Sequence, residues 1–433
     1  GNTFEGCTNL TKVVFAEGVT HIHTVSKYFV DSKLFGKEVS YTGSGNANVF
    51  AGCPIEEVVF PSTLVSIGSG AFRNCNITNL VFPASLTEIG DNAFEGNNIQ
   101  SITFEKDAEG KSALKTIGAN AFVGHSLSGK LEIPASVTTI GKYAFAGKER
   151  VEILNEAGEG TGEYDYTDCS TLTEVVLPEG LTEVNEGTFA YLYNLAKVNV
   201  ENIGRFNALS FAYAGMLNEE GIELTFGTMT NVNSTIHKVN ETTHEVESFG
   251  NGPFGYANIK KMTFLDADNI KGKLLHSISK MPEIVFPEGL TALPDHFYYG
   301  SFFEEITIPA NIESFGNNVF EYCINLKKVV FEDGSQLKTI GTFAFSYCIN
   351  LASVNLPDSL ESMGIWAFRG AWSLKSLVIP ANCYLDSYTT ALWGEDQTLY
   401  LRSPLKYANC DYDFNFDKSG TMGKANIVCG YKG

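Results

Sequence analysis

Few side chains in this sequence have the types and spacing that chemistry would require. His21 and His23 stand two residues apart, which would turn both imidazoles to one side of a strand, but no acidic or cysteine partner completes a metal site nearby. The stretch Asp411-x-Asp-x-Asn-x-Asp417 resembles a calcium loop, yet it lacks Gly at its sixth position and Glu at its twelfth. We interpret the histidines as a surface pair and the Asp-rich stretch as strand alternation.

No nucleophile, phosphate loop or redox pair adds to these candidates. Asp266-x-Asp268 also fails as a calcium loop, because Ile270 occupies the fifth position. The sequence contains no Ser/His/Asp arrangement, phosphate-binding loop or CxxC pair. It therefore predicts no catalytic residue, no metal site and no cofactor.

Nine cysteines invite a disulfide interpretation that their spacing weakens. Equivalent positions of neighbouring repeats lie close enough for a bridge but point the same way, whereas a disulfide needs a dihedral angle of about 90°. We expect buried free thiols that act as small hydrophobic groups. Cys410 and Cys429 would pair if the C-terminal segment folds as a hairpin. Six cysteines follow an aromatic residue by three positions: Cys7, Cys53, Cys75, Cys169, Cys323 and Cys348.

The most informative pattern is the phrase Ile-Gly-x-x-Ala-Phe, which begins at Ile67, Ile89, Ile117, Ile140 and Ile340. Phe4 and Phe29 add two degenerate copies of its closing aromatic. Self-similarity at this period predicts a solenoid of stacked coils. The aromatics that close the phrase, or a looser version of it, recur mostly 21 to 25 residues apart: Phe50, Phe72, Phe94, Phe122, Phe145, Tyr166, Phe189, Phe297, Phe320, Phe345 and Phe368.

Each part of the repeat has a physical role. Residues 171–178 alternate apolar and polar, which predicts a strand with Leu172, Val175 and Leu177 on its inner side, ended by Pro178. In the phrase, we expect Gly to form a tight corner because it has no β-carbon, Ala to allow a close backbone approach and Phe to fill the core. One coil cannot bury its own apolar face, so stacked coils must share a core and a parallel strand ladder.

Residues 345–368 carry a family resemblance. Phe345-Ser-Tyr-Cys-Ile-Asn-Leu351, followed by Leu-Pro357-x-Ser-Leu-x-x-Met-Gly-x-x-Ala-Phe368, resembles the BspA-type (Treponema pallidum type) leucine-rich repeat of bacterial and some protozoan surface proteins. The resemblance implies a β-rich leucine-rich repeat solenoid, a right-handed arc with a parallel strand ladder and about 16 coils of roughly 23 residues. It also implies an extracellular or surface-attached protein that adheres to host proteins, and it brings no catalytic residues.

The repeat also suggests how the chain is divided. We expect a leucine-rich repeat solenoid over 1–394, with an irregular region at 201–279 where the phrase dissolves, and a C-terminal capping segment over 395–433 with a hairpin turn at 417–420. The chain begins almost directly in a coil and no signal peptide is visible, so we expect that earlier residues have been removed. The expected location, extracellular or at the cell surface, therefore rests on the resemblance alone.

Composition and charge limit the possible partners. The 433 residues include 31 Phe and 44% hydrophobic residues, enough for a continuous core, yet no apolar run approaches the roughly 18 to 20 residues that would span a bilayer. The net charge of −20 argues against nucleic acid, whose binding proteins present basic patches to phosphate. It fits simple solubility or a basic or neutral partner. We expect a monomer that binds a protein ligand, such as a host extracellular protein.

The residues that face outward from the predicted strand are the candidate binding site. Most are β-branched, and stacking should align them into a column with charged residues on either side. Val and Thr suit any pleated strand surface, which is the structural interpretation, but exposed apolar patches with polar rims often bind partners. Our hypothesis is that this column forms the floor of a protein-binding surface: Val14, Val59, Val81, Thr103, Glu132, Val176, Thr263, Val285, Thr307, Val330, Asn355 and Val378.

Interruptions of the repeat are the second candidate. Residues 106–113, 146–165 and 201–279 depart from the pattern, and such insertions in solenoids project as loops that often carry function. We therefore predict a non-enzymatic protein that mediates adhesion or protein recognition through its strand ladder and inserted loops. Two alternatives stay open. One is a passive structural spacer, and the other is a carbohydrate-binding module that uses Trp366, Trp372, Trp393 and Tyr384 as stacking platforms.

Overall fold

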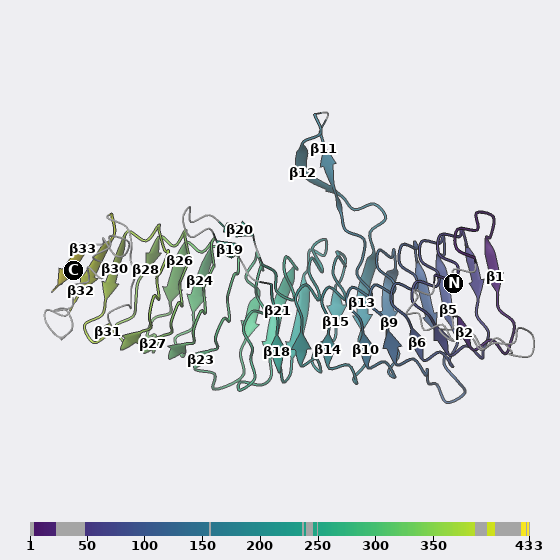
Figure 1. The fold of residues 1–433 in the computed structure, drawn as a ribbon. Helices are drawn as coiled ribbons and strands as arrows, with labels where there is room; N and C mark the ends of the chain where they lie inside the picture. Colours follow the sequence, from purple (N-terminus) through teal and green to yellow (C-terminus); the bar gives the residue numbers. More distant parts are fainter. Residues whose placement is uncertain are drawn as a thin grey trace, which may run out of the picture. The chain divides into compact units, whose positions relative to one another are not determined.

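The computed structural model describes residues 4–22, 48–155, 157–235, 238–239, 246–248, 250–385, 396–402, 426–429 and 431–432. The chain forms two compact units, Gly1–Ile203 with Ser210–Ile222, and Gly204–Leu209 with Glu223–Gly433. The described residues form strands and turns and no helix. Within each unit, short strands of successive coils lie side by side (Figure 1). These parallel ladders confirm the predicted fold class, a β-rich repeat solenoid.

The described coils of the first unit contribute strands of two to six residues, called the longer strands here, to one set of parallel sheets. β1 pairs with β3, β5 with β7, and β13 with both β9 and β15. Leu172 and Val175 are buried in β13 as predicted, because successive residues of a strand face opposite ways. The strands are β1 (Lys12–Val14), β3 (Glu57–Val59), β5 (Asn79–Phe82), β7 (Ser101–Phe104), β9 (Ser128–Glu132), β13 (Thr171–Val176) and β15 (Lys197–Val198).

A second set of strands, absent from the sequence-based prediction, ends on the aliphatic residue of the repeated phrase. Glu88 is exposed and Ile89 is buried, and strands of two residues are too short for periodicity to reveal. Five of them form one parallel sheet in the order β10, β8, β6, β4, β2. The strands are β2 (His21–Ile22), β4 (Ser66–Ile67), β6 (Glu88–Ile89), β8 (Thr116–Ile117), β10 (Thr139–Ile140) and β14 (Glu183–Val184).

The second unit has the same two kinds of strand. Its longer strands are β17 (Ile222–Phe226), β21 (Ile259–Phe264), β22 (Glu283–Val285), β24 (Glu305–Ile308), β26 (Lys328–Phe331), β28 (Ser353–Val354), β30 (Ser376–Ile379), β32 (Thr398–Leu401) and β33 (Asn426–Cys429). Its short strands are β16 (Arg205–Phe206), β18 (Asn231–Val232), β23 (Ala292–Leu293), β25 (Ser314–Phe315), β27 (Thr339–Ile340), β29 (Ser362–Met363) and β31 (Tyr384–Leu385).

The last described strands continue the ladder. β32 pairs in parallel with β30 and with β33, so β32 and β33 do not form a hairpin with each other. The predicted turn at 417–420 lies outside the described residues, as does Cys410, and the pairing of Cys410 with Cys429 therefore stays a prediction.

Two antiparallel hairpins interrupt the coils. β11 (Val151–Leu154) and β12 (Gly160–Asp165) form the first, within the insertion predicted at 146–165. β19 (Lys238–Val239) and β20 (Val246–Ser248) form the second, within the irregular region.

A column of aromatic rings runs through the core of each unit. In the first unit Phe72 and Phe94 stack with 5.3 Å between ring centroids, and both are fully buried. The stacked pairs continue through Phe4–Phe50, Phe50–Phe72, Phe94–Phe122, Phe122–Phe145, Phe145–Phe189 and Phe189–Phe211. In the second unit they run through Tyr298–Phe320, Phe320–Phe345 and Phe345–Phe368.

This column corrects two of the predicted aromatics. Phe145 stacks directly on Phe189, so Tyr166 closes no coil, because the hairpin is inserted within one coil and shifts the spacing. Phe29 lies outside the described residues, so its copy of the phrase stays a prediction. In the second unit Tyr298 takes the place predicted for Phe297, which packs edge-on against it.

The glycine of the phrase has a different role from the predicted one. Its φ angle is not positive at Gly90, Gly118 or Gly141. A β-carbon on Gly90 would instead lie 2.6 Å from the Ser69 backbone nitrogen, so close packing against the preceding coil requires this glycine. The left-handed conformation falls on the residue before Ala, as at Asn92, which has φ of 56°.

The position three residues after the aromatic supplies a hydrogen-bond donor to a neighbouring coil. The Cys75 thiol donates to the Phe50 carbonyl oxygen at 3.3 Å, and the Cys323 thiol donates to that of Tyr298 at 3.0 Å. Asn97 occupies the same position and donates to the Phe72 carbonyl oxygen. Among the described residues, the free cysteines are Cys7, which is exposed, and the buried Cys53, Cys75, Cys169, Cys323, Cys348 and Cys383. Free buried thiols are thus confirmed for the repeat except Cys7, and their role as donors was missed.

Candidate binding surface

The outward column predicted from the sequence exists on the longer strands of the first unit. Val14 lies opposite Val59 in the β1–β3 pair, and Val81 lies opposite Thr103 in the β5–β7 pair. Val14, Val59 and Val81 are 62%, 43% and 51% exposed, and Thr103 is exposed as well. Further along, half-buried Val176 lies opposite exposed Glu132. Branched side chains are therefore open to solvent in register.

The second unit carries an equivalent column with more burial. Thr263 lies opposite Val285, and Thr307 lies opposite Val330. Thr307 is exposed, while Thr263, Val285, Val330 and Val378 are half-buried. The structure thus places the predicted residues opposite one another within each pair of neighbouring strands, whereas Asn355 follows the end of β28 and Val378 lies opposite Tyr400.

Charged side chains beside the column pair with one another between coils. Lys12 and Glu57 lie 2.8 Å apart. In the second unit, Lys327 and Glu304 are also 2.8 Å apart. These pairs are well exposed, so they contribute little to stability and leave the charges accessible to a partner.

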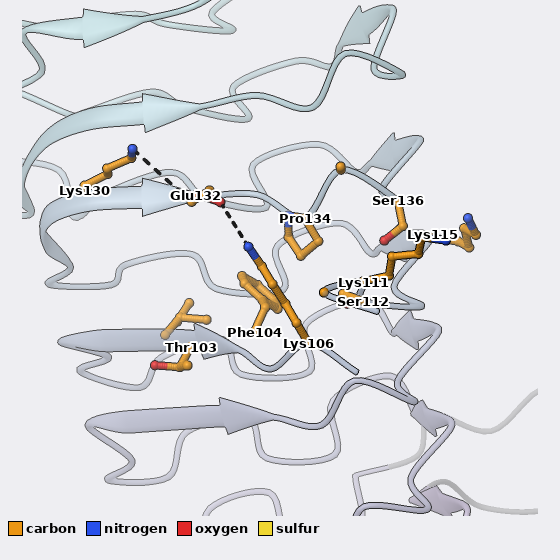
Figure 2. A pocket seen from close by; sticks show the side chains of 13 residues that line it. Thr103, Phe104, Lys106, Lys111, Ser112, Lys115, Lys130, Glu132, Pro134 and Ser136 are labelled. Atoms are coloured by element: carbon orange, nitrogen blue, oxygen red, sulfur yellow. Dashed lines mark ion pairs between the residues drawn. The ribbon is translucent and has the colours of Figure 1, made fainter. Parts of the chain in front are cut away.

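A pocket of about 640 Å³ forms where the column meets the insertion at 106–113 (Figure 2). Thr103 on β7 and Glu132 on β9 belong to the column, and both line the pocket. Ser136, from the turn that follows β9, has a buried hydroxyl oxygen with no hydrogen-bond partner among the described residues. The pocket therefore joins the two features that the sequence marked as candidates.

Four lysines and a single carboxylate line this pocket. Glu132 lies 3.6 Å from the Lys106 ammonium and 3.8 Å from that of Lys130, as Figure 2 shows. Outside the lining, Lys111 pairs with Glu109 at 3.0 Å and Lys130 pairs with Glu174 at 3.6 Å, whereas Lys115 makes no ion pair within the described part of the chain. A positive pocket on a chain with net charge −20 favours an anionic group.

The sequence analysis missed this lysine cluster, although a signal was present. Lys106, Lys111 and Lys115 fall within ten residues, in and just after the insertion at 106–113, which is a local concentration of positive charge in an acidic chain. Lys130, from the following coil, joins them only through folding.

The aromatics proposed as carbohydrate platforms lie in different surroundings. Trp366 packs edge-on against Phe343 at 5.4 Å, and the Arg369 guanidinium lies 5.0 Å from its ring. Tyr384 is 56% exposed, and Trp393 lies outside the described residues. In the same unit, burial raises the pKa of Glu321 to about 7, although Asn318 donates a hydrogen bond to it.

Among the described residues, no group of three or more His, Cys, Asp or Glu side chains is placed to hold a metal ion. The Asp266 carboxylate accepts hydrogen bonds from Thr228 at 2.8 Å and from Asn269 at 3.0 Å, so it serves a turn. His23 and the stretch 411–417 lie outside the described ranges. Within those ranges, no helical segment has the length and apolar character needed to cross a bilayer.

Comparison with protein families decides the identity of the repeat. The model of the BspA type leucine rich repeat region matches residues 45–155, 108–218, 225–327 and 314–391, which together cover most of the chain. The chain belongs to the BspA-type leucine-rich repeat family. The resemblance seen at residues 345–368 is thereby confirmed. A comparison with curated proteins found no significant match.

A solved structure shares the fold of this BspA-type chain, and others show weaker similarity. A leucine-rich repeat protein from Bacteroides ovatus is similar over 97% of this chain and 92% of its own, with 20% identity and a TM-score of 0.50. A leucine rich cell surface protein from Faecalibacterium prausnitzii covers 71% of this chain and 74% of its own, with 21% identity and a TM-score of 0.36. The pneumococcal vaccine antigen PcpA covers 98% and 90%, with 17% identity and a TM-score of 0.34.

Proposed function

We propose that this chain is a non-enzymatic recognition protein, displayed at the cell surface or secreted, which binds a protein partner along its outward ladder and inserted loops. The observation that carries the proposal is the in-register column of exposed branched residues, such as Val59, Val81 and Thr103, which runs into the lysine-lined pocket. An exposed apolar stripe with a polar rim is typical of an interaction site. A host extracellular protein is the proposed partner and adhesion is the proposed outcome.

The pocket defines how such a partner would be oriented. Apolar side chains of the partner would cover the column, and an acidic side chain would enter the pocket beside Lys115 and Lys130. Charge pairs at the rim of an interface chiefly set orientation and association rate. We further infer that the protein acts as a monomer, that residues 1–394 form the recognition scaffold and that 395–433 cap it.

The test compares two charge-matched triple variants of the whole chain. Val59→Lys/Val81→Lys/Val330→Lys places three charges in the column, and Ser66→Lys/Thr139→Lys/Ser314→Lys places three on the outer side of the short strands. Binding is measured on purified host extracellular matrix proteins and on a glycan array. We expect binding to matrix proteins that only the column variant loses. Equal binding by the column variant and the wild type would refute the proposal, and binding to glycans alone would favour the carbohydrate alternative.

A further inference from the structure

The hairpin β11–β12 stands away from the coils of the first unit (Figure 1). Both its strands are exposed along their whole length. Val151 and Leu154 are 61% and 59% exposed, Ile153 is 42% exposed and Tyr164 is 37% exposed. Two strands without a packed face are at best marginally stable in water, and so many open apolar side chains are unusual on a small excursion.

The hairpin is nevertheless well built at its turn. The Asn155 side-chain oxygen accepts hydrogen bonds from the backbone of Ala157 and of Glu159, each at 2.9 Å. The Thr161 hydroxyl donates to the Ile153 carbonyl oxygen across the strands at 2.7 Å. These bonds define the shape of the hairpin without covering its apolar side chains.

Arg150 anchors the base of the hairpin to the coils. Its guanidinium lies 3.7 Å from the centre of the Tyr164 ring and donates to the Tyr166 hydroxyl at 2.8 Å. Its backbone nitrogen donates to the hydroxyl of Tyr193, a fully buried core residue, at 3.0 Å. The anchor presents the hairpin in a defined orientation, which lowers the entropy that a partner must offset on binding.

Charge identifies the kind of partner. Residues 151–165 contain five carboxylates, one each at Glu152, Glu156, Glu159, Glu163 and Asp165, and no Lys or Arg. A second copy of the hairpin would bring like charges together, and an anionic lipid surface would repel it. A basic segment of another protein would complement both the carboxylates and the aliphatic side chains.

The edge of β12 offers a place for such a segment. Within the described residues β12 pairs only with β11, so its outer edge has no strand beside it. Gly162 has a positive φ of 77° at an irregularity of the β11–β12 pairing, so the regular part of the free edge is the stretch from Glu163 to Asp165. Strand addition supplies main-chain hydrogen bonds, while alternating side chains give specificity.

We propose that the β11–β12 hairpin is a docking site for an extended basic segment of a partner protein, which adds as a third strand along β12. Its Lys or Arg side chains pair with Glu163 and Asp165 on one face of β12, and its alternating aliphatic side chains pack beside Tyr164 on the other face. This site deepens the proposed function, since it gives one inserted loop a partner chemistry, and it is separate from the ladder column.

The first experiment uses two synthetic peptides of about ten residues, one alternating Lys with Val and the other alternating Glu with Val, and measures binding to the whole chain by fluorescence anisotropy. We expect the basic peptide to bind at least roughly tenfold more tightly. Glu163→Gln/Asp165→Asn should remove most of this difference, whereas Glu219→Gln/Glu220→Gln, which removes two exposed carboxylates elsewhere in the same unit, should not change it. Equal affinity for both peptides would overturn the proposal, as would unchanged binding by Glu163→Gln/Asp165→Asn or an equal loss in the Glu219→Gln/Glu220→Gln control.

Two further variants separate this site from the ladder. Replacement of 151–165 by a short Gly-Ser link should abolish peptide binding while the melting temperature stays unchanged, because Phe145 and Phe189 stack without the hairpin. Val59→Lys/Val81→Lys/Val330→Lys should keep peptide binding even if it loses the matrix protein. Retained peptide binding by the hairpin deletion would contradict the site, and loss in the column variant would place the peptide on the ladder instead.

Discussion

At the scale of single residues, the repeat is determined by contacts between coils. Gly90 is required because the backbone of the preceding coil occupies the space that a side chain would fill. The buried donor three residues after the aromatic is Cys75 in one coil and Asn97 in the next, and both donate to the aromatic residue of the preceding coil. His125 in the coil after donates to Phe145 of the following coil instead. The position therefore requires a hydrogen-bonding group that reaches a neighbouring coil and not one residue type.

Gly90→Ala should destabilise the protein by about 1 to 3 kcal/mol, because its β-carbon would overlap the Ser69 nitrogen and the backbone would have to shift. Gly180→Ala is the matched control, since a β-carbon there meets nothing within 4 Å and the φ angle is not positive. Urea unfolding of both variants measures the difference. Equal midpoints for the two would contradict the close-packing explanation.

His125 should make the stability of the first unit depend on pH. The Leu127 backbone N–H donates to Nδ1, so Nε2 carries the proton and donates to the Phe145 carbonyl oxygen. Burial lowers the pKa of His125 from 6.5 to about 4. Between these values the unfolded chain binds a proton that the folded chain does not, so stability is complete above pH 6.5 and is lost as the pH falls toward 4.

The expected loss is about 3 kcal/mol across that window. His125→Asn, which places at this position the side chain that Asn97 supplies one coil earlier, should lack this loss. Unfolding free energies of both proteins between pH 7 and pH 4 would reveal it as a growing difference. Curves that remain parallel would show that the imidazole is not protected by burial.

At the scale of elements, one coil consists of two short strands and two turns that surround an aromatic side chain, which stacks on those of the neighbouring coils. The prolines start the turns, as where the Leu86 backbone nitrogen donates to the Pro83 carbonyl oxygen at 3.1 Å and brings Leu86 into the core. A coil tolerates a long insertion, because the hairpin β11–β12 lies between Phe145 and Phe189 in the sequence and their rings still stack. The position of a coil is therefore determined by packing against its neighbours more than by its own length.

Phe94→Ala should cost about 3 to 5 kcal/mol, because the ring is fully buried between Phe72 and Phe122. Nearest-neighbour coupling predicts that the damage is local. Hydrogen exchange should therefore accelerate in β5, β7 and β8 and remain unchanged in β24 and β26 of the second unit. Faster exchange spread evenly over both units would contradict nearest-neighbour coupling.

At the scale of the whole molecule, charge is the dominant feature. The 50 acidic residues exceed the 30 basic ones, and the exposed ion pairs between coils neutralise only part of the excess. The apolar column, the lysine-lined pocket and the exposed aliphatic side chains of the hairpin therefore differ from the rest of the acidic surface. A partner would recognise these surfaces by their apolar or positive character.

Self-repulsion of this net charge predicts that salt stabilises the chain. Raising NaCl from about 20 mM to about 300 mM at pH 7 should raise the melting temperature, because screening weakens the repulsion. Calorimetry at the isoelectric pH of about 4.8 supplies the control, where the effect should vanish. A melting temperature that falls with salt at pH 7 would mean that the ion pairs outweigh the repulsion.

The sequence alone determined the fold class, the family, the inward residues such as Leu172 and the outward column, because alternation and a fixed period are local properties that a single strand or coil imposes. Tertiary structure decided the rest. Only packing between coils could assign the core position to Tyr298 in place of Phe297, give Gly90 its role, form the short second ladder and collect Lys106 and Lys130 around one pocket. These outcomes depend on distances between residues a whole repeat apart, and no local pattern contains them.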